Sequence, residues 1–230
     1  MKIAVITGAS DGIGKASAKK LSDDGFFVCL LARSEDKLKQ ARKEIKNSDY
    51  FVCDITDAKK VEQTIKEIAK KYKRIDVLVN DAGIWIEGEL DSNEPDDIRK
   101  AIETNSIAQL YVTKEVIPIM KKQKSGIIIN IVSQAGLMGK AERVVYNASK
   151  YAMTGATHSL QLELRKYGIK VAGIYPAKVN TTMFIKAGIK KSVDNALQPE
   201  DVANSVIYIV SQPKDIEISD IILRLSLIHI

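Results

Sequence analysis

A tyrosine and a lysine four positions apart, Tyr146 and Lys150, form a pair that could transfer a proton. The sequence between them is helical in pattern, so both side chains project from one face about one turn apart. An ammonium group beside a phenol stabilises the phenolate and lowers the tyrosine pKa from its ordinary value of about 10. Such a pair can exchange a proton with a carbonyl or alcohol oxygen. Taken alone, the same spacing also fits two surface neighbours.

A serine favours the catalytic interpretation. Ser133 ends the apolar run 126–132, which is typical of a buried strand. Open α/β sheets bind ligands at the carboxyl ends of their strands, where this hydroxyl can hydrogen-bond the oxygen that Tyr146 protonates. A hydrolase triad of Ser133 with His158 is disfavoured, because the serine lacks a G-x-S-x-G elbow. His158 also has no partner at ligand spacing, so we expect a surface or interface histidine and predict no metal site.

A glycine-rich turn follows the first apolar run, in the segment Thr7-Gly8-Ala9-Ser10-Asp11-Gly12-Ile13-Gly14. Between a strand and a helix, such a turn lets the backbone approach a pyrophosphate whose charge is held by N–H groups at the helix N-terminus. The glycines alone also fit a plain tight turn. Their position directly after the first predicted strand favours binding of a dinucleotide.

Short β-branched runs alternate with helical patterns along the chain. The predicted strands are 2–7, 27–32, 49–53, 76–80, 126–132, 170–175 and 217–223, and the predicted helices are 12–24, 35–46, 57–72, 95–122, 146–167 and 199–211. This alternation predicts an α/β fold in one domain over residues 1–224, a doubly wound parallel sheet of about seven strands with helices on both faces. The irregular segment 177–198 breaks the rhythm, and we expect a lid within 181–192.

Composition excludes several classes of protein. Of the 230 residues, 45% are hydrophobic and 28% charged, as in ordinary globular proteins. The net charge of +6 comes from 35 basic residues spread among 29 acidic ones, so we predict no nucleic-acid partner. No run approaches the roughly 20 apolar residues of a membrane span, and no signal peptide precedes the first strand, so we expect a cytoplasmic protein without a membrane partner.

The two cysteines and the C-terminal tail carry no part of the predicted chemistry. Cys29 and Cys53 lie in apolar runs, and we expect buried free thiols. Residues 225–230 match what one reading frame of a common transposase sequencing adapter encodes. Their origin is therefore doubtful, and no functional role is predicted for any of them.

The glycine spacing T-G-x-x-x-G-x-G of Gly8, Gly12 and Gly14 differs from the usual G-x-G-x-x-G and resembles the short-chain dehydrogenase/reductase family. The resemblance covers nearly all of residues 1–224. Further motifs follow in the family's order: Asp54, Asn80-Asp81-Ala82-Gly83, Asn105, Ser133, Tyr146-Asn147-Ala148-Ser149-Lys150 and Pro176. It implies a Rossmann-like fold and an NAD(P)-dependent enzyme acting on CH–OH groups.

The resemblance also implies roles for individual residues. Asn105, Ser133, Tyr146 and Lys150 are the implied catalytic residues, with Lys150 also on the nicotinamide ribose and Asn105 holding a helix kink and a relay water. Val179 and Thr181 are expected to meet the nicotinamide carboxamide. The implied cofactor-binding residues are Thr7, Gly8, Ser10, Asp11, Gly12, Ile13, Gly14, Arg33, Asp54, Ile55, Asn80, Ala82, Gly83, Tyr146, Lys150, Pro176, Val179 and Thr181.

Two positions depart from the family's pattern. Asp81 stands where the family usually has asparagine, and Ala177 where it usually has glycine. Neither change removes a catalytic group. Ala177 restricts a backbone that glycine would leave free, so we expect the start of the following loop to take a different path.

The end of the second predicted strand indicates which cofactor is bound. An NAD-selective site places Asp or Glu about 20 residues beyond the glycine turn to bind the ribose hydroxyls, whereas Ala32 stands there in this chain. Arg33 follows and can pair with a 2′-phosphate. We therefore predict NADP as the cofactor, ahead of NAD. Asp11 opposes this preference, because NADP-preferring relatives often carry a basic residue at its position, so we expect moderate selectivity.

The substrate is a carbonyl compound or secondary alcohol. Residues 198–224 resemble the branch containing NADP-dependent 3-hydroxy acid and serine dehydrogenases, which favours a small 3-hydroxy or 3-oxo acid. They resemble 3-oxoacyl-carrier-protein reductases less closely, which is the alternative. A catalytically silent nucleotide-sensing regulatory protein would need only the glycine turn. The family pairs its long helices across a twofold axis, which implies a homodimer or homotetramer.

Overall fold

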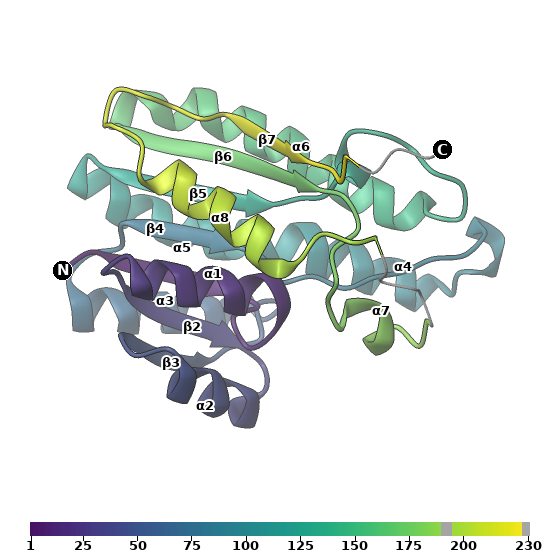
Figure 1. Ribbon diagram of the computed structural model, residues 1–230, viewed down its shortest axis with the longest axis horizontal. Helices are drawn as coiled ribbons and strands as arrows, with labels where there is room; N and C mark the ends of the chain where they lie inside the picture. Colours follow the sequence, from purple (N-terminus) through teal and green to yellow (C-terminus); the bar gives the residue numbers. More distant parts are fainter. Residues whose placement is uncertain (190–194, 227–230) are drawn as a thin grey trace.

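The computed structural model describes residues 1–189 and 195–226, in which parallel strands alternate with helices (Figure 1). The strands form one sheet in the order β3-β2-β1-β4-β5-β6-β7. They are β1 (Ile3–Thr7), β2 (Phe27–Ala32), β3 (Ser48–Val52), β4 (Val77–Asn80), β5 (Gly126–Ile131), β6 (Ile169–Pro176) and β7 (Asp220–Leu223). The predicted fold class is confirmed.

The strand order reverses at the middle of the sheet. The chain begins with β1, moves outward to β3, and then returns to place β4 on the other side of β1. Ala4 therefore pairs with Val28 on one side and with Val77 on the other. A crevice forms at the carboxyl ends of strands where their order reverses, and open α/β sheets bind their ligands there. In Figure 1 these ends point toward α4 (Pro95–Ile102) and α7 (Met183–Lys186).

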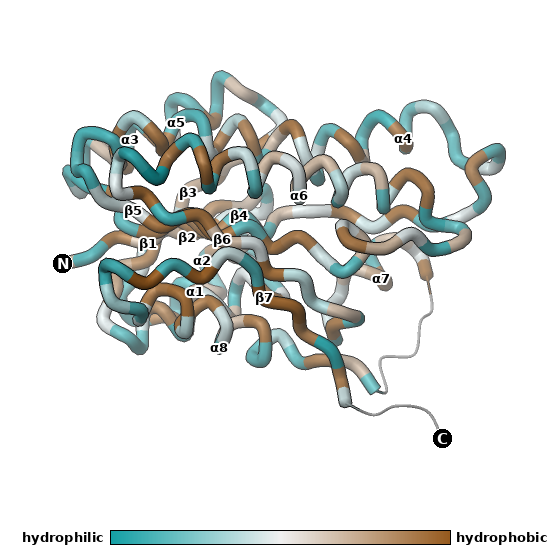
Figure 2. The backbone as a smooth tube through the Cα atoms, turned by 90° about the horizontal axis from the view of Figure 1, so that it is seen from above, coloured by the Kyte–Doolittle hydropathy of each residue, from teal (hydrophilic) through white to brown (hydrophobic). Residues whose placement is uncertain are grey.

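Helices cover both faces of the sheet (Figure 2). The helices on one face are α1 (Gly12–Asp23), α2 (Glu35–Glu44) and α8 (Pro199–Val210), and those on the other are α3 (Ala58–Tyr72), α5 (Ala108–Gln123) and α6 (Val144–Leu164). Successive strand residues point to opposite faces: Ala4 and Ile6 join the first core, and Ile3 and Val5 join the second. Both faces are buried, which explains why the strand sequences are almost continuously apolar.

The structure differs from the predicted elements in three places. The single helix expected over 95–122 is divided into α4, a π-helical turn at Glu103–Ile107, and α5. The last strand is shorter than predicted, and the irregular segment 177–198 contains the single-turn helix α7. Residues 190–192 of the expected lid and 227–230 of the tail lie outside the described residues. Leu225 packs against the core between the sheet and α1 and α8.

The described residues also show where the cysteines and His158 lie, and whether they contain a membrane-spanning helix or a cluster of metal ligands. Among them, no helix is both long and apolar enough to cross a membrane. Cys29 and Cys53 are free and buried, as expected. His158 Nε2 lies 3.0 Å from Asp220 Oδ2 at the edge of the sheet. Within residues 1–189 and 195–226, no three His, Cys, Asp or Glu side chains gather as a metal site would require.

A chain of buried amides links the two central strands to the helices over them. Asn80 Nδ2 donates to Thr113 Oγ1 on α5 and to Asn130 Oδ1 on β5, each at 2.9 Å. Asn130 Nδ2 in turn donates to Thr157 Oγ1 on α6, also at 2.9 Å. The side chains of Asn80, Asn130 and Thr157 are fully buried, so water cannot replace a lost partner.

We expect Asn130→Ala to lower the free energy of unfolding by about 1–3 kcal/mol, because it removes one hydrogen bond from the buried Asn80 amide and one from the buried Thr157 hydroxyl. Urea denaturation followed by circular dichroism measures this loss. Asn204→Ala, on the exposed face of α8, is the matched control and should stay within about 0.5 kcal/mol of the wild type. Equal stability of the two variants would contradict the structural role of the amide chain.

Candidate functional site

A cavity of about 1260 Å³ lies at the carboxyl ends of the strands. Most of the predicted site residues line it, namely Gly8, Ser10, Asp11, Gly12, Ile13, Arg33, Asp54, Ile55, Ala82, Gly83, Ser133, Tyr146, Lys150, Pro176, Val179 and Thr181. They come from segments that follow six different strands, and the sheet brings them together. The structure places Thr7, Gly14, Asn80 and Asn105 behind this wall rather than on it.

The glycine turn is closely packed against the segment after β4. A Cβ atom at Gly14 would lie 2.6 Å from the carbonyl oxygen of Gly8, so no larger residue fits there without a backbone shift. Gly8 has a φ of +70°, a conformation that residues with a Cβ rarely adopt. The turn is also tied to β2, because Ala9 N–H donates to Leu31 O at 3.2 Å. The backbone of the turn is therefore held open toward the cavity.

Thr7 and Asn80 support the site from behind. The Thr7 hydroxyl oxygen accepts hydrogen bonds from Asp81 N–H at 3.0 Å and Ala82 N–H at 3.2 Å, which joins the end of β1 to the end of β4. Asn80 belongs to the buried amide chain described above. Both had been predicted to contact the cofactor. That contact stays a prediction; in the structure Thr7 holds the start of residues 81–83, and Asn80 holds β4 to β5 and α5.

Asn105 lies within the π-helical turn, where the resemblance had placed a helix kink. Its side chain binds both backbone groups of Ile84, accepting from the N–H at 2.7 Å and donating to the carbonyl at 3.0 Å. Its amide nitrogen also donates to Ser149 Oγ on α6 at 3.1 Å. Asn105 is fully buried and therefore joins the segment after β4 to the helix that carries Tyr146 and Lys150.

Ser133 has an unusual backbone conformation for a residue other than glycine. Its φ of 146° is strained, and strain of this kind persists only where the surrounding structure enforces it. The Ser133 hydroxyl accepts a hydrogen bond from Ala135 N–H at 3.1 Å and also bonds the Tyr146 hydroxyl. Asn147, the neighbour of Tyr146, donates to the carbonyls of Ala135 and Met138. These bonds hold the serine and the tyrosine in register.

The electrostatics of Tyr146 differ from the expectation. Burial raises the pKa of Tyr146 to about 12, although the hydrogen bond from Ser133 and the charge of Arg143 lower it in part. Lys150 Nζ lies 5.8 Å from the centre of the tyrosine ring and 3.4 Å from Ile131 O. Burial therefore sets the Tyr146 pKa in this structure, and the lowering expected from the Lys150 ammonium group together with an oxidised nicotinamide stays a prediction. The phenol holds its proton at neutral pH and can donate it.

Two carboxyl groups lie at the glycine turn. Burial raises the pKa of Asp81 to about 7, against the opposing effects of Lys150 and the Gly14 N–H. Burial likewise lowers the pKa of Lys150 to about 8, although the charge of Asp81 favours the ammonium form. Asp11 behaves differently. Hydrogen bonds from Thr182 and Lys186 outweigh its burial and lower the pKa of Asp11 to about 2.

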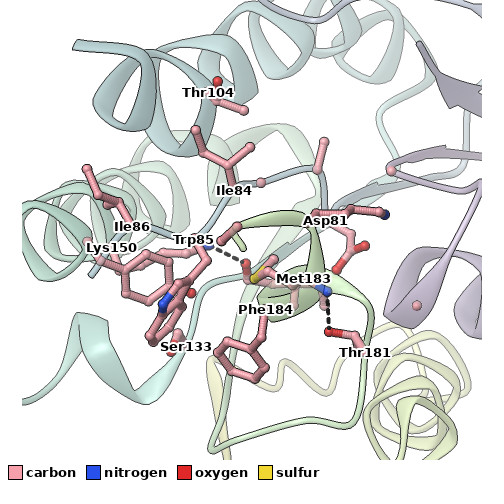
Figure 3. Close-up of a pocket in the computed structure, with 18 of the residues that line it drawn as sticks. Asp81, Ile84, Trp85, Ile86, Thr104, Ser133, Lys150, Thr181, Met183 and Phe184 are labelled. Atoms are coloured by element: carbon pink, nitrogen blue, oxygen red, sulfur yellow. Dashed lines mark hydrogen bonds between the residues drawn. The ribbon is translucent and has the colours of Figure 1, made fainter. Parts of the chain in front are cut away.

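Aromatic side chains cover Tyr146. The Trp85 ring lies 4.4 Å from that of Tyr146 and 4.9 Å from that of Phe184 on α7, measured between ring centroids. Figure 3 shows Trp85 and Phe184 gathered with Met183 on the cavity side of Ser133. Arg143 stacks on Trp85 and pairs with Glu87 at 3.1 Å. The wall beside Tyr146 is therefore mainly apolar, with an ion pair at its edge.

A family model described as short chain dehydrogenase matches residues 2–192. The chain belongs to this family. A curated short-chain dehydrogenase relative, an uncharacterized oxidoreductase of Staphylococcus aureus strain MRSA252, is 33% identical over 97% of this chain and 96% of its own length.

Solved short-chain dehydrogenases share the fold over nearly the whole chain. A metagenomic short-chain oxidoreductase in complex with NADP has 32% identity and a TM-score of 0.87, covering 98% of this chain and 97% of its own. A betaketoacyl-[ACP] reductase from Bacteroides thetaiotaomicron has 36% identity and a TM-score of 0.84, with the same coverage. The short-chain dehydrogenase fold predicted from the glycine spacing is thereby confirmed.

Sequence reasoning missed two ion pairs of this short-chain dehydrogenase. Lys186 and Asp11 are 175 positions apart, and Arg143 and Glu87 are 56 apart, so no local spacing indicates either contact. Asp81 was noted only as a departure from the family's pattern. Its sequence position after β4 gave the one available signal, because that position lies at the ligand-binding edge of the sheet.

The raised pKa of Asp81 predicts a pH-dependent stability. Between pH 4 and 7 the folded chain keeps a proton on Asp81 that the unfolded chain releases, so this group costs stability as the pH rises. We expect Asp81→Asn to stabilise the protein at pH 8 by up to about 4 kcal/mol and to have little effect near pH 4. Thermal unfolding from pH 4 to 8 measures the difference.

Asp11→Asn is the control with the opposite sign. The pKa of Asp11 is lowered, so its charge contributes stability that is present above about pH 4 and lost as the pH falls toward 2. This variant should therefore be less stable than the wild type at neutral pH. If the difference between wild type and Asp81→Asn did not change with pH, the carboxyl of Asp81 would not be buried as described.

Proposed function

We propose that the protein is an NADP(H)-dependent oxidoreductase that interconverts a carbonyl and a secondary alcohol by hydride transfer. The observation that carries this proposal is the convergence of Ser133, Tyr146 and Lys150 on the cavity that the glycine turn also lines. The related short-chain oxidoreductase solved with NADP supports the choice of cofactor. A nucleotide sensor would not need the three catalytic groups.

The residues at the carboxyl end of β2 fit a phosphorylated ribose. Arg33, Ser34 and Lys37 line the cavity together. Ser34 is the N-cap of α2, and its side chain makes no capping bond in the described chain, so the helix N-terminus retains donors for a phosphate. Gly8, Ser10 and Gly12 line the cavity at the glycine turn, where the backbone can approach a pyrophosphate. When bound, NADPH would supply the hydride.

The chain's own residues supply the proton and hold the substrate. Tyr146 is protonated at neutral pH and donates its proton to the carbonyl oxygen as the carbonyl is reduced. The Ser133 hydroxyl orients that oxygen through a second hydrogen bond. With a pKa of about 8, Lys150 is mainly charged at neutral pH, and its ammonium group offsets the negative charge that develops on the phenol.

The substrate that we propose is a small 3-oxo or 3-hydroxy acid. A 3-oxoacyl-carrier-protein reductase is the second candidate, favoured by the likeness to the bacterial betaketoacyl-[ACP] reductase. Reduction of 3-oxo acids, acyl thioester models, diketones and sugars, followed by NADPH absorbance, separates these candidates. Tight NADPH binding without oxidation by any compound would support the regulatory alternative.

We further propose assembly into a homodimer or homotetramer through α5 and α6. These two helices carry exposed apolar side chains that the described chain leaves uncovered, among them Leu110 on α5 and Tyr151 and Leu162 on α6. Exposed apolar side chains on neighbouring long helices are typical of an interface between subunits.

Replacing the proton donor tests the mechanism. We expect Tyr146→Phe to lower kcat for carbonyl reduction by about 10²–10⁴-fold while NADPH binding stays within a few-fold, because only the hydroxyl is lost. Tyr208→Phe is the control, since Tyr208 is exposed on α8 and does not line the cavity, and it should retain the wild-type rate. Near-native turnover by Tyr146→Phe, with chemistry rate-limiting, would exclude Tyr146 as the acid.

Steady-state kinetics with both cofactors tests the preference for NADP(H). We expect kcat/KM for NADPH to exceed that for NADH by about one to two decades, because a charge-assisted bond from Arg33 to the 2′-phosphate contributes roughly 1.5–3 kcal/mol. Ala32→Asp combined with Arg33→Ala should reverse the preference, since the new carboxylate repels the phosphate and binds ribose hydroxyls. An equal or higher value for NADH in the wild type would refute the proposal.

A further inference from the structure

Carboxylates occupy a helix N-terminus that would be expected to attract anions. Asp11 Oδ1 accepts the N–H of Gly12 at 2.8 Å, and the carboxyl group of Asp81 accepts the N–H of Gly14. Helix N-termini favour negative charge, which is why phosphates bind there. An ionised side chain at the same place repels a phosphate. A phosphate-binding role for this turn therefore requires that the charge of Asp11 be offset.

The negative charge of Asp11 is offset by Lys186 of α7, which lies 175 positions further along the chain. Lys186 Nζ lies 2.9 Å from Asp11 Oδ2, and the same oxygen accepts a hydrogen bond from Thr182 Oγ1 at 2.6 Å. Phe184 of the same helix meets Trp85, so α7 is held both at the glycine turn and at the wall beside Tyr146. About half of the Lys186 side chain is exposed, and such ion pairs add little to stability. The pair instead changes the charge that a bound ligand meets.

Asp11, Lys186 and Arg33 all line the same cavity. The hydrogen bond from Ala9 N–H to Leu31 O holds the glycine turn beside the end of β2. Asp11 follows Ala9 by two residues in the turn, and Arg33 follows Leu31 by two residues at the end of β2. The charge of Asp11 therefore opposes that of Arg33 where we place the phosphorylated ribose. Lys186 offsets the charge of Asp11 and so adds to the positive charge of Arg33 and Lys37.

We propose that Lys186 is a specificity-determining residue for NADP(H), because it offsets Asp11 beside the site of the 2′-phosphate. This inference rests on the NADP(H) preference proposed above. NAD(H) lacks the 2′-phosphate, so its binding depends less on the offset. The wild type therefore selects NADP(H) through a lysine from the segment after β6, in addition to Arg33 at the end of β2.

A double-mutant cycle measured by binding tests the inference. Trp85 is the only tryptophan in the sequence and lines the same cavity, so its fluorescence reports binding of NADPH and NADH without turnover. We expect Lys186→Gln to raise Kd for NADPH about 3–10-fold and Kd for NADH less than 2-fold. Asp11→Asn added to Lys186→Gln should return Kd for NADPH to within about 2-fold of the wild type, because no carboxylate then needs an offset.

Two further variants complete the cycle. Asp11→Asn alone keeps an oxygen that can cap Gly12, and it should bind NADPH as tightly as the wild type or more tightly. Lys186→Arg retains the charge and should preserve the selectivity. Equal weakening of both cofactors by Lys186→Gln, or no rescue by Asp11→Asn, would overturn the inference. If the wild type itself bound NADH as tightly as NADPH, the proposed cofactor preference would fail instead.

Discussion

The hydrogen bonds from Asp81 N–H and Ala82 N–H to the Thr7 hydroxyl join β1 to β4 where the strand order reverses. The rest of the site depends on this junction. It sets the glycine turn against residues 81–83 so closely that a Cβ at Gly8 would lie 3.0 Å from Ala82 N, and one at Gly14 would lie 2.8 Å from Asp81 Oδ2. Behind it, the buried Asn80 and Asn130 amides tie both central strands to α5 and α6. The glycine turn and α6 are therefore held in place by the same connected set of buried hydrogen bonds.

Burial decides the protonation states around this frame. Tyr146 and Lys150 are almost completely buried, and the loss of water raises the pKa of the phenol and lowers that of the ammonium group. The tyrosine is therefore a ready proton donor in the direction of carbonyl reduction. Alcohol oxidation requires the phenolate, which this environment disfavours until further positive charge reaches the site.

The segment after β6 connects the two halves of the cavity. Phe184 contacts Trp85 beside the catalytic tyrosine, and Lys186 contacts Asp11 at the glycine turn, although α7 is a single turn long. A change in the position of α7 therefore affects both the apolar wall and the charge near the cofactor. This arrangement explains how a chain with an acidic residue in its glycine turn can still bind a phosphate-rich cofactor.

The sequence by itself determined the fold class and predicted residues most of which line the cavity. Apolar strands alternating with amphipathic helices permit few architectures, and parallel strands bring their carboxyl ends to one edge, so Gly8, Arg33 and Ser133 were predictable as neighbours. It also indicated Tyr146 and Lys150, because their spacing is local to one helix. Only the tertiary structure decided that Asn80 and Asn105 are buried behind the wall, that burial raises the Tyr146 pKa, and that Lys186 meets Asp11. Each of these depends on distances between segments far apart in the chain, which no local pattern encodes.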